Sequence, residues 1–111
     1  MSRTPRWRGP KKQRREPEAW LYRTDGTAER AVPRNGRDFG LSEVYELLGI
    51  DMVEVVGLNG GKIILLDEEG KLKDRPMVNG PATKLYHESW PLNADDRIVG
   101  DAIVCDASMF R

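Results

Sequence analysis

Cysteine, histidine and long hydrophobic runs are scarce in this sequence of 111 residues, and each scarcity excludes a class of protein. The single cysteine, Cys105, excludes an internal disulfide and a zinc site built on several cysteines. The longest uninterrupted apolar run, residues 63–66, is far shorter than the roughly 20 residues of a membrane-spanning helix. No apolar stretch follows the basic N-terminus, so we expect no secretory signal, no membrane association and a reducing, cytoplasmic environment.

The chain has no net charge, but its charges are unevenly distributed. The first 15 residues hold seven basic side chains and no acidic one, whereas the rest of the chain holds 11 basic and 18 acidic side chains. The charge is therefore +7 on residues 1–15 and −7 on the remainder, which favours two parts with different roles. Three prolines and the lack of an apolar period predict a disordered basic arm at residues 1–18, followed by a compact domain at residues 19–111.

The basic arm supports two interpretations. In the first, its cations contact nucleic-acid phosphates and its tryptophan stacks on a base. The residues concerned are Arg3, Arg6, Trp7, Arg8, Lys11, Lys12, Arg14 and Arg15. In the second, the arm is a solvated tail or folds back onto the acidic domain. The charge of −7 on the rest of the chain would repel a nucleic-acid duplex, which weakens the first interpretation.

Turn residues and hydrophobic periodicity predict the first five secondary-structure elements. Strands at 20–22 and 27–32 flank a turn at Asp25-Gly26, and strands at 52–56 and 62–66 flank Asn59-Gly60-Gly61. Between the two hairpins, residues 41–48 have the apolar spacing of a short helix, with Ser42 as its N-cap and Gly49 as its C-cap. The side chains expected to face the core are Leu41, Val44, Tyr45, Leu47 and Leu48.

The remaining elements are a second helix and a last strand. Asn79-Gly80-Pro81 predicts the start of the helix, which ends at Trp90-Pro91. The last strand is expected at residues 97–106, with Gly100 at a bulge or a close backbone approach. The order β-β-α-β-β-α-β predicts a single small α+β domain with a mixed or mainly antiparallel sheet and two short helices. An exposed edge strand near Trp20 or Lys71 would permit a homodimer without requiring one.

Few residues point to catalysis or to a metal. The segment 57–62 is similar to a phosphate-binding loop, but its spacing is short and a strand follows where a helix should begin. His87 is the only histidine, no nucleophile motif frames Ser89 or Ser108, and Cys105 lies among apolar neighbours. The acidic groups after residue 66 and around residues 95–101 lack the spacing of a calcium loop, so we expect solvated turns, no metal and no cofactor.

A small-ligand site is the strongest local hypothesis. Asn79, Thr83, Tyr86 and Trp90 recur at helical spacing and could line one edge of a pocket. Polar groups between aromatic walls suit a ligand of nucleotide size. The same four residues would also make an ordinary capped helix with a half-buried aromatic face, and the sequence leaves both interpretations open.

Several short motifs, in this order, resemble those of domain-of-unknown-function family 3846. This is a small protein family found in bacteriophages, plasmids and some bacterial genomes. They are Asp25-Gly26, Pro33-Arg34-Asn35-Gly36, Gly60-Gly61, Asp67-Glu68-Glu69-Gly70-Lys71-Leu72, Asn79-Gly80-Pro81-Ala82-Thr83 and Asp96-Arg97-Ile98-Val99-Gly100-Asp101. The resemblance covers about residues 19–106 and leaves the basic arm outside. It implies a small accessory protein of a mobile element, and it carries no catalytic residues over to this chain.

The residues predict a non-enzymatic binding protein, and the resemblance implies a phage or mobile-element origin and the cytoplasm of a bacterial host. Its expected role is to neutralise or modulate a host factor, either a protein or a small nucleotide signal. The alternative is a nucleic-acid-binding protein that acts through residues 1–15. An enzyme centred on His87 or on a metal is the third hypothesis, and it has the least support in the sequence.

Overall fold

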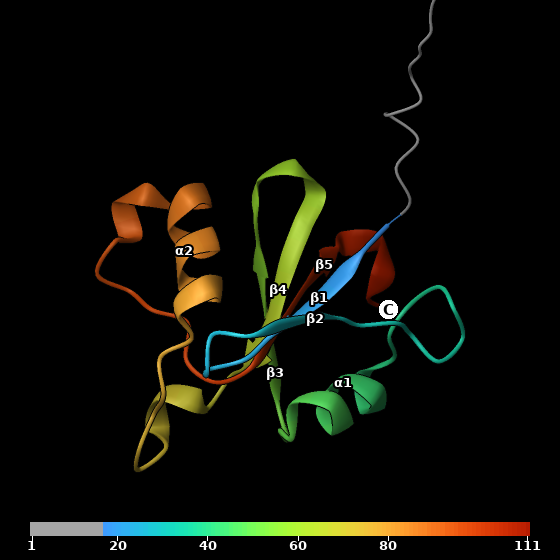
Figure 1. The fold of residues 1–111 in the computed structure, drawn as a ribbon, viewed down its shortest axis with the longest axis horizontal. Coiled ribbons are helices and arrows are strands. Elements are labelled where there is room, and N and C mark those ends of the chain that lie inside the picture. Colours follow the sequence, from blue (N-terminus) through green and yellow to red (C-terminus); the bar gives the residue numbers. More distant parts are fainter. Residues whose placement is uncertain (1–16) are drawn as a thin grey trace, which may run out of the picture.

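A computed structural model describes residues 17–111, so residues 1–16 of the predicted basic arm at 1–18, and the contacts predicted for them, lie outside the described part of the chain. The five strands are β1 (Ala19–Tyr22), β2 (Ala28–Arg30), β3 (Val53–Gly57), β4 (Lys62–Asp67) and β5 (Ala102–Asp106). The two α-helices are α1 (Leu41–Leu48) and α2 (Gly80–Ser89). The element order and the α+β class predicted from the sequence are confirmed (Figure 1).

The strands form one antiparallel sheet in the order β2-β1-β5-β4-β3. Strands β1 and β2 form one hairpin and β3 and β4 form the other, as their turn residues predicted. Strand β5, the last in the chain, lies between the two hairpins and pairs with β1 and β4. The last strand therefore joins the two hairpins into a single sheet.

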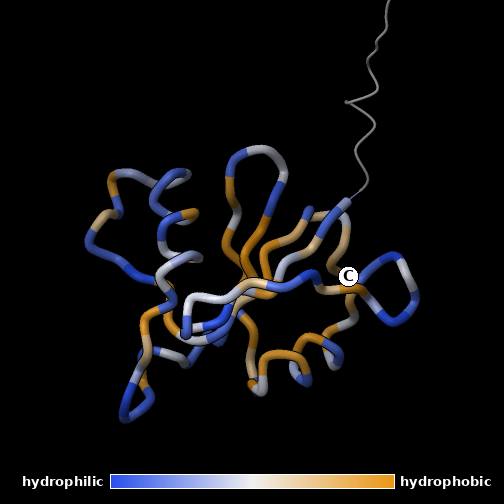
Figure 2. Tube along the Cα trace, viewed as in Figure 1, coloured by the Kyte–Doolittle hydropathy of each residue, from blue (hydrophilic) through white to orange (hydrophobic). Residues whose placement is uncertain are grey.

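Each face of the sheet is covered by one helix (Figure 1). Ile63 and Leu65 of β4 belong to the hydrophobic cluster that includes Val44 of α1, and Ile64 belongs to the cluster that includes Tyr86 of α2. Because both faces of β4 are buried, its central residues 63–66 are apolar without alternation. The hydropathy colouring accordingly shows the most hydrophobic stretches in the middle of the sheet (Figure 2).

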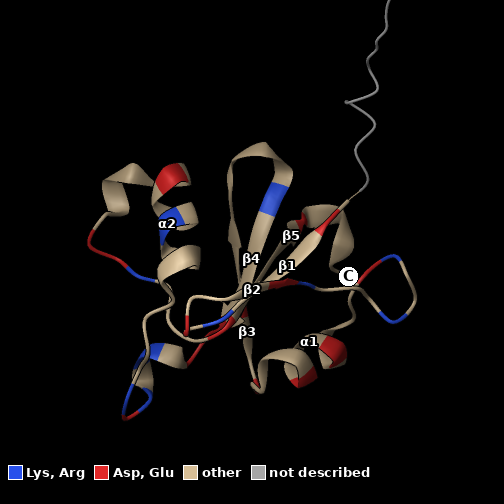
Figure 3. Cartoon of the chain, in the orientation of Figure 1, with Lys and Arg blue, Asp and Glu red and all other residues tan. Residues whose placement is uncertain are grey.

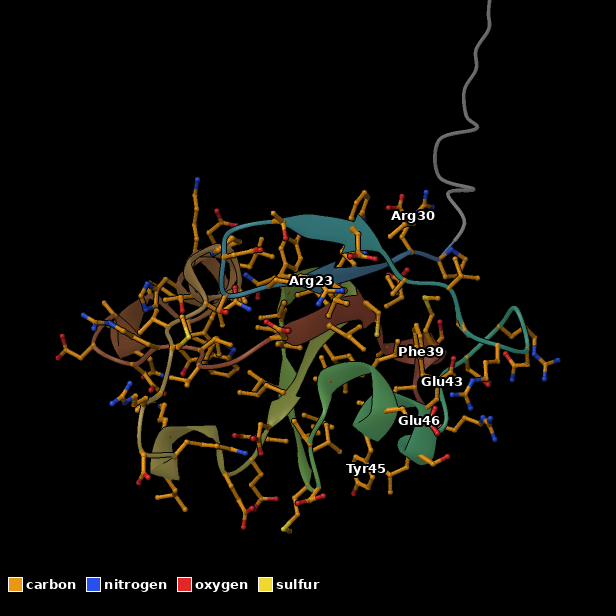
Figure 4. All side chains as sticks on the ribbon, turned by 60° about the horizontal axis from the view of Figure 1, so that its bottom comes forward. Arg23, Arg30, Phe39, Glu43, Tyr45 and Glu46 are labelled. Atoms are coloured by element: carbon orange, nitrogen blue, oxygen red, sulfur yellow. The ribbon has the colours of Figure 1, made fainter. Side chains whose placement is uncertain are left out.

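Helix α1 differs from its predicted form at its N-terminus and on its exposed face. The N-cap is Gly40 and not Ser42, and no side chain caps the helix. Glu43 is buried, and its carboxylate accepts a hydrogen bond from the Arg34 backbone N–H at 2.9 Å, which holds the preceding loop against the helix. The predicted C-cap is confirmed, since Gly49 adopts the left-handed conformation with φ 66°. Figure 4 shows Glu43 on this helix, close to Phe39.

The predicted inward stripe of α1 is only partly correct, and this has a measurable consequence. Val44 is fully buried, whereas Leu41 and Leu47 keep 45% and 40% of their surface exposed. We therefore expect Leu47→Ala to lower the free energy of unfolding by only about 1 kcal/mol, less than the 2–5 kcal/mol of a buried leucine. Urea denaturation checks this value, with Val44→Ala as the matched variant. A larger loss for Leu47→Ala than for Val44→Ala would contradict the observed packing.

The end of the chain departs from the predicted strand at 97–106. Strand β5 begins only at Ala102, because Gly100 has φ 85° and turns the backbone before it. The preceding segment makes an isolated bridge between Val99 and Val78, and the Gly100 N–H donates to the Met77 carbonyl at 2.8 Å. This segment runs beside the entry to α2 and forms one wall of the cleft described below. Within the described range 17–111, no helix has the length and apolar character needed to cross a membrane.

Candidate functional site

A cleft of about 330 Å³ lies between α2 and the outer hairpin β3–β4. Its floor includes Glu54 and Val56 of β3 and Leu66 of β4, and its helical wall is formed by Tyr86 and Trp90. The opposite wall is the segment that contains Asn93 and residues 96–99, while Glu68 and Lys71 close one end. This volume is at the lower end of the range for small-ligand sites. It suits one small ligand or the side chains of a short peptide.

Two hydrogen bonds fasten the C-terminus of α2 to the outer hairpin. The indole Nε1 of Trp90 donates to the Gly57 carbonyl at 2.7 Å, and the Ser89 Oγ accepts from the Asn59 backbone N–H at 3.0 Å. Trp90 nevertheless keeps 45% of its surface exposed. The hydrogen bond orients the indole ring. The ring therefore presents an exposed aromatic surface at the cleft.

The opposite wall is held by a network around the buried Tyr86. Its hydroxyl donates to Asp96 Oδ2 at 3.3 Å and accepts from Asn93 Nδ2 at 3.0 Å. Lys71 donates a hydrogen bond to Asp96 Oδ1 and forms an ion pair with that carboxylate. The Lys71 hydrogen bond lowers the pKa of the Asp96 carboxyl below its usual value despite partial desolvation, so Asp96 is ionised at neutral pH.

The charges that line the cleft are unequal in number. Four carboxylates, those of Glu54, Asp67, Glu68 and Asp96, face two cations, Lys71 and Arg97. Asp96 is neutralised by Lys71, and Asp67 lies 3.3 Å from Lys73 Nζ. Glu54 and Glu68 form no ion pair with any other residue of the described chain. The cleft therefore has a surplus of negative charge beside an exposed indole.

The structure separates the four predicted ligand residues into two pairs. Tyr86 and Trp90 line the cleft, but Asn79 and Thr83 are buried beneath it and are bonded to backbone. Asn79 accepts from the Ala82 N–H at 3.1 Å and donates to the Tyr22 and Gly100 carbonyls, each at 2.9 Å. The Thr83 hydroxyl accepts from the Ile98 N–H at 2.9 Å and donates to the Ile98 carbonyl at 3.3 Å. Their observed contacts hold the α2 N-terminus and the wall segment in place.

Sequence reasoning did not select the acidic floor and rim as part of this site. In the sequence Glu68 belongs to an acidic turn and Glu54 to a predicted strand, and neither pattern by itself indicates a site. A usable signal exists, because a single glutamate in the apolar strand around residue 54 marks one face of that strand as polar. Only the pairing of β3 with β4 places that face beside α2.

The residues considered for catalysis lie apart or are occupied. His87 Nε2 is 2.7 Å from the Asp96 carbonyl oxygen, and the Ser89 hydroxyl is engaged with Asn59. Cys105 is buried on the opposite face of the sheet, where desolvation raises the pKa of its thiol to about 11, so the reactive thiolate is scarce at neutral pH. The glycine-rich segment 57–62 connects β3 to β4, as the hairpin prediction required. Residues 17–111 bring together no group of three or more side chains able to ligate a metal ion.

Comparison with known proteins identified no family model, no curated protein and no solved structure that matches this chain. The resemblance to domain-of-unknown-function family 3846 therefore stays a prediction from its short motifs. The candidate site is defined by the geometry of the chain itself.

Proposed function

We propose that this chain is a non-enzymatic binding protein whose cleft takes cationic side chains of a partner protein. The observation that supports this proposal is a cleft lined by the exposed Trp90 indole and by two carboxylates, Glu54 and Glu68, that form no ion pair within the described residues. A cation between a carboxylate and an aromatic face is attracted by both. In the context of the phage resemblance, the partner is a basic surface of a host protein that the binding would neutralise or modulate.

The charge of the cleft makes a nucleotide signal the less suitable ligand. Once the pairs Lys71–Asp96 and Lys73–Asp67 are set aside, a phosphate in the cleft would meet two carboxylates, Glu54 and Glu68, and one cation, Arg97. The two predicted polar contacts at Asn79 and Thr83 are engaged with backbone groups instead. The energy of a charged ligand in this site therefore favours a cation over an anion.

Isothermal titration calorimetry with an N-acetylated tetra-arginine peptide tests the proposal. We expect binding to the natural chain, weakening as salt is added because the exposed charges become screened. A tetra-glutamate peptide and AMP are the anionic comparisons and should bind more weakly. The titration is repeated on a full-length variant in which the seven basic residues of 1–15 are glutamine, since a +7 segment would repel or replace a cationic probe.

The double variant Glu54→Gln/Glu68→Gln measures the contribution of the cleft. It should weaken peptide binding about fivefold, because two exposed charges together contribute up to about 1 kcal/mol of binding free energy. Trp90→Leu should weaken it about threefold through loss of the cation–π contact. The matched control, Glu29→Gln/Glu46→Gln, removes two exposed carboxylates on β2 and α1, away from the cleft. If the control weakens peptide binding equally, the effect is due to the net charge of the protein and not to the cleft. If the peptide binds neither the natural chain nor the glutamine variant of residues 1–15, the proposal is refuted.

A further inference from the structure

We infer that the basic N-terminal residues of this chain are themselves a ligand of the acidic cleft, so that an external partner must displace them. The inference rests on the proposed function and adds an autoinhibitory contact to it. Three observations support it: the charge of the two parts, the register of the sheet and the length of chain before β1.

The two parts of the chain are electrostatically complementary. Residues 1–15 carry +7, whereas the described residues 17–111 hold 11 basic and 17 acidic side chains, a charge of −6. Two acidic side chains near α1 already have a cation, since Glu46 pairs with Arg34 and Asp38 pairs with Arg111. Figure 3 shows the acidic positions on α1 in red. At the cleft, by contrast, Glu54 and Glu68 have no cation of their own among the described residues. A basic segment would therefore be attracted to the two carboxylates of the cleft.

The register of the sheet places the start of the fold close to the cleft. Ala19 of β1 is paired with Cys105, Cys105 with Ile63, and Ile63 with Gly57. These four residues form one row across the sheet, and three strand spacings correspond to about 15 Å. Gly57 is the residue whose carbonyl accepts the Trp90 indole hydrogen bond. The chain thus enters the sheet about 15 Å from the aromatic wall of the site.

The length of the preceding segment is sufficient for this distance. Sixteen residues span at most about 50 Å, more than three times the separation along the row. A tethered ligand of this kind acts at an effective concentration of about 1 mM. Even a weak cationic contact, with a Kd of about 0.1 mM, would then occupy the cleft for most of the time and raise the apparent Kd of a competitor about tenfold.

The test compares the natural chain with two full-length variants after nuclease treatment. In the first, the seven basic residues of 1–15 are replaced by glutamine. In the second, the five arginines of that segment are replaced by lysine, which keeps the charge of +7. We expect the glutamine variant to bind the tetra-arginine peptide about tenfold more tightly than the natural chain, and the lysine variant to stay within about threefold of it.

A second measurement reports on the site directly. The indole N–H of Trp90, which donates to the Gly57 carbonyl, gives its own nuclear magnetic resonance signal. We expect this signal and the amide signals of Glu54 and Glu68 to differ between the natural chain and the glutamine variant, independently of protein concentration. Addition of a peptide of residues 1–15 to the glutamine variant should shift them back toward their natural positions.

Each alternative has a distinct result. Equal peptide affinity of the natural chain and the glutamine variant overturns the autoinhibitory contact but leaves the proposed function intact. A Trp90 shift that grows with protein concentration overturns the contact within one chain in favour of a second copy. Failure of both forms to bind the peptide refutes the proposed function, and the inference with it.

Discussion

Phe39→Ala is expected to lower the free energy of unfolding by about 3–5 kcal/mol, the largest loss among the substitutions considered. The Phe39 side chain is completely buried in the cluster on the α1 face of the sheet, which also contains Val44, Leu65 and Ile103. Removal of the ring leaves a cavity that these neighbours cannot fill, because strands β4 and β5 are held in place on both sides. For a domain of this size the loss corresponds to a fall in Tm of at least about 12 °C.

The backbone contacts of Phe39 make the experiment interpretable. Its N–H donates to the Met109 carbonyl at 2.6 Å, and its carbonyl accepts from the Arg111 N–H at 3.1 Å. An alanine at this position keeps both backbone hydrogen bonds, so the chain end stays attached to the loop before α1. The loss of unfolding free energy then measures the burial of the ring alone. Urea denaturation should show a lower midpoint at an unchanged slope.

Leu92→Ala is the matched control, since that side chain is 98% exposed, and its stability should change by less than about 0.5 kcal/mol. Phe39→Leu, which keeps most of the volume, should lose no more than about 1.5 kcal/mol and remains measurable if the alanine variant does not fold. Equal losses for Phe39→Ala and Leu92→Ala would contradict the packing described above.

Asn79→Ala is expected to lower the free energy of unfolding by about 3 kcal/mol. About 1 kcal/mol comes from the lost N-cap of α2, where the Asn79 side chain accepts from the Ala82 N–H. The remainder comes from the partly buried Tyr22 and Gly100 carbonyls, which both lose the amide donor of the fully buried Asn79 side chain. Thermal and urea denaturation measure the total.

Asn79→Asp separates the two contributions. The aspartate keeps an acceptor for the α2 cap but removes both amide donors and places a carboxylate against two carbonyl oxygens, so at neutral pH it should be no more stable than the alanine variant. Asn93→Ala is the control because Asn93 is exposed and its side chain donates one hydrogen bond, to the Tyr86 hydroxyl. Its loss should stay below about 1 kcal/mol. A smaller loss for Asn79→Ala than for Asn93→Ala would show that Asn79 does not join the three elements.

Local physical chemistry accounts for the parts of this fold that the sequence predicted. The turn at Asn59-Gly60-Gly61, the C-cap at Gly49 and the start of α2 at Asn79-Gly80-Pro81 each depend on backbone preferences or hydrogen bonds within about four residues. Such signals can be recognised from residues that are adjacent in the sequence. The same reasoning was wrong about Ser42 as a cap, because Gly40 is the N-cap and the helix begins at Leu41. Glu43, the third residue of the helix, is bonded to Arg34 of the preceding loop.

The sequence by itself therefore determined the order and type of the elements, the hairpins and the charge separation between the basic arm and the acidic domain. Tertiary structure decided that β5 lies between β1 and β4, that Phe39 is in the core, and that Glu54 and Trp90 lie on the same cleft. These outcomes depend on contacts between residues far apart in the sequence, such as Ala19 with Cys105. The residues next to each partner do not indicate such a pairing. Such pairings are selected by the packing of both sheet faces at once, so only the assembled fold determines them.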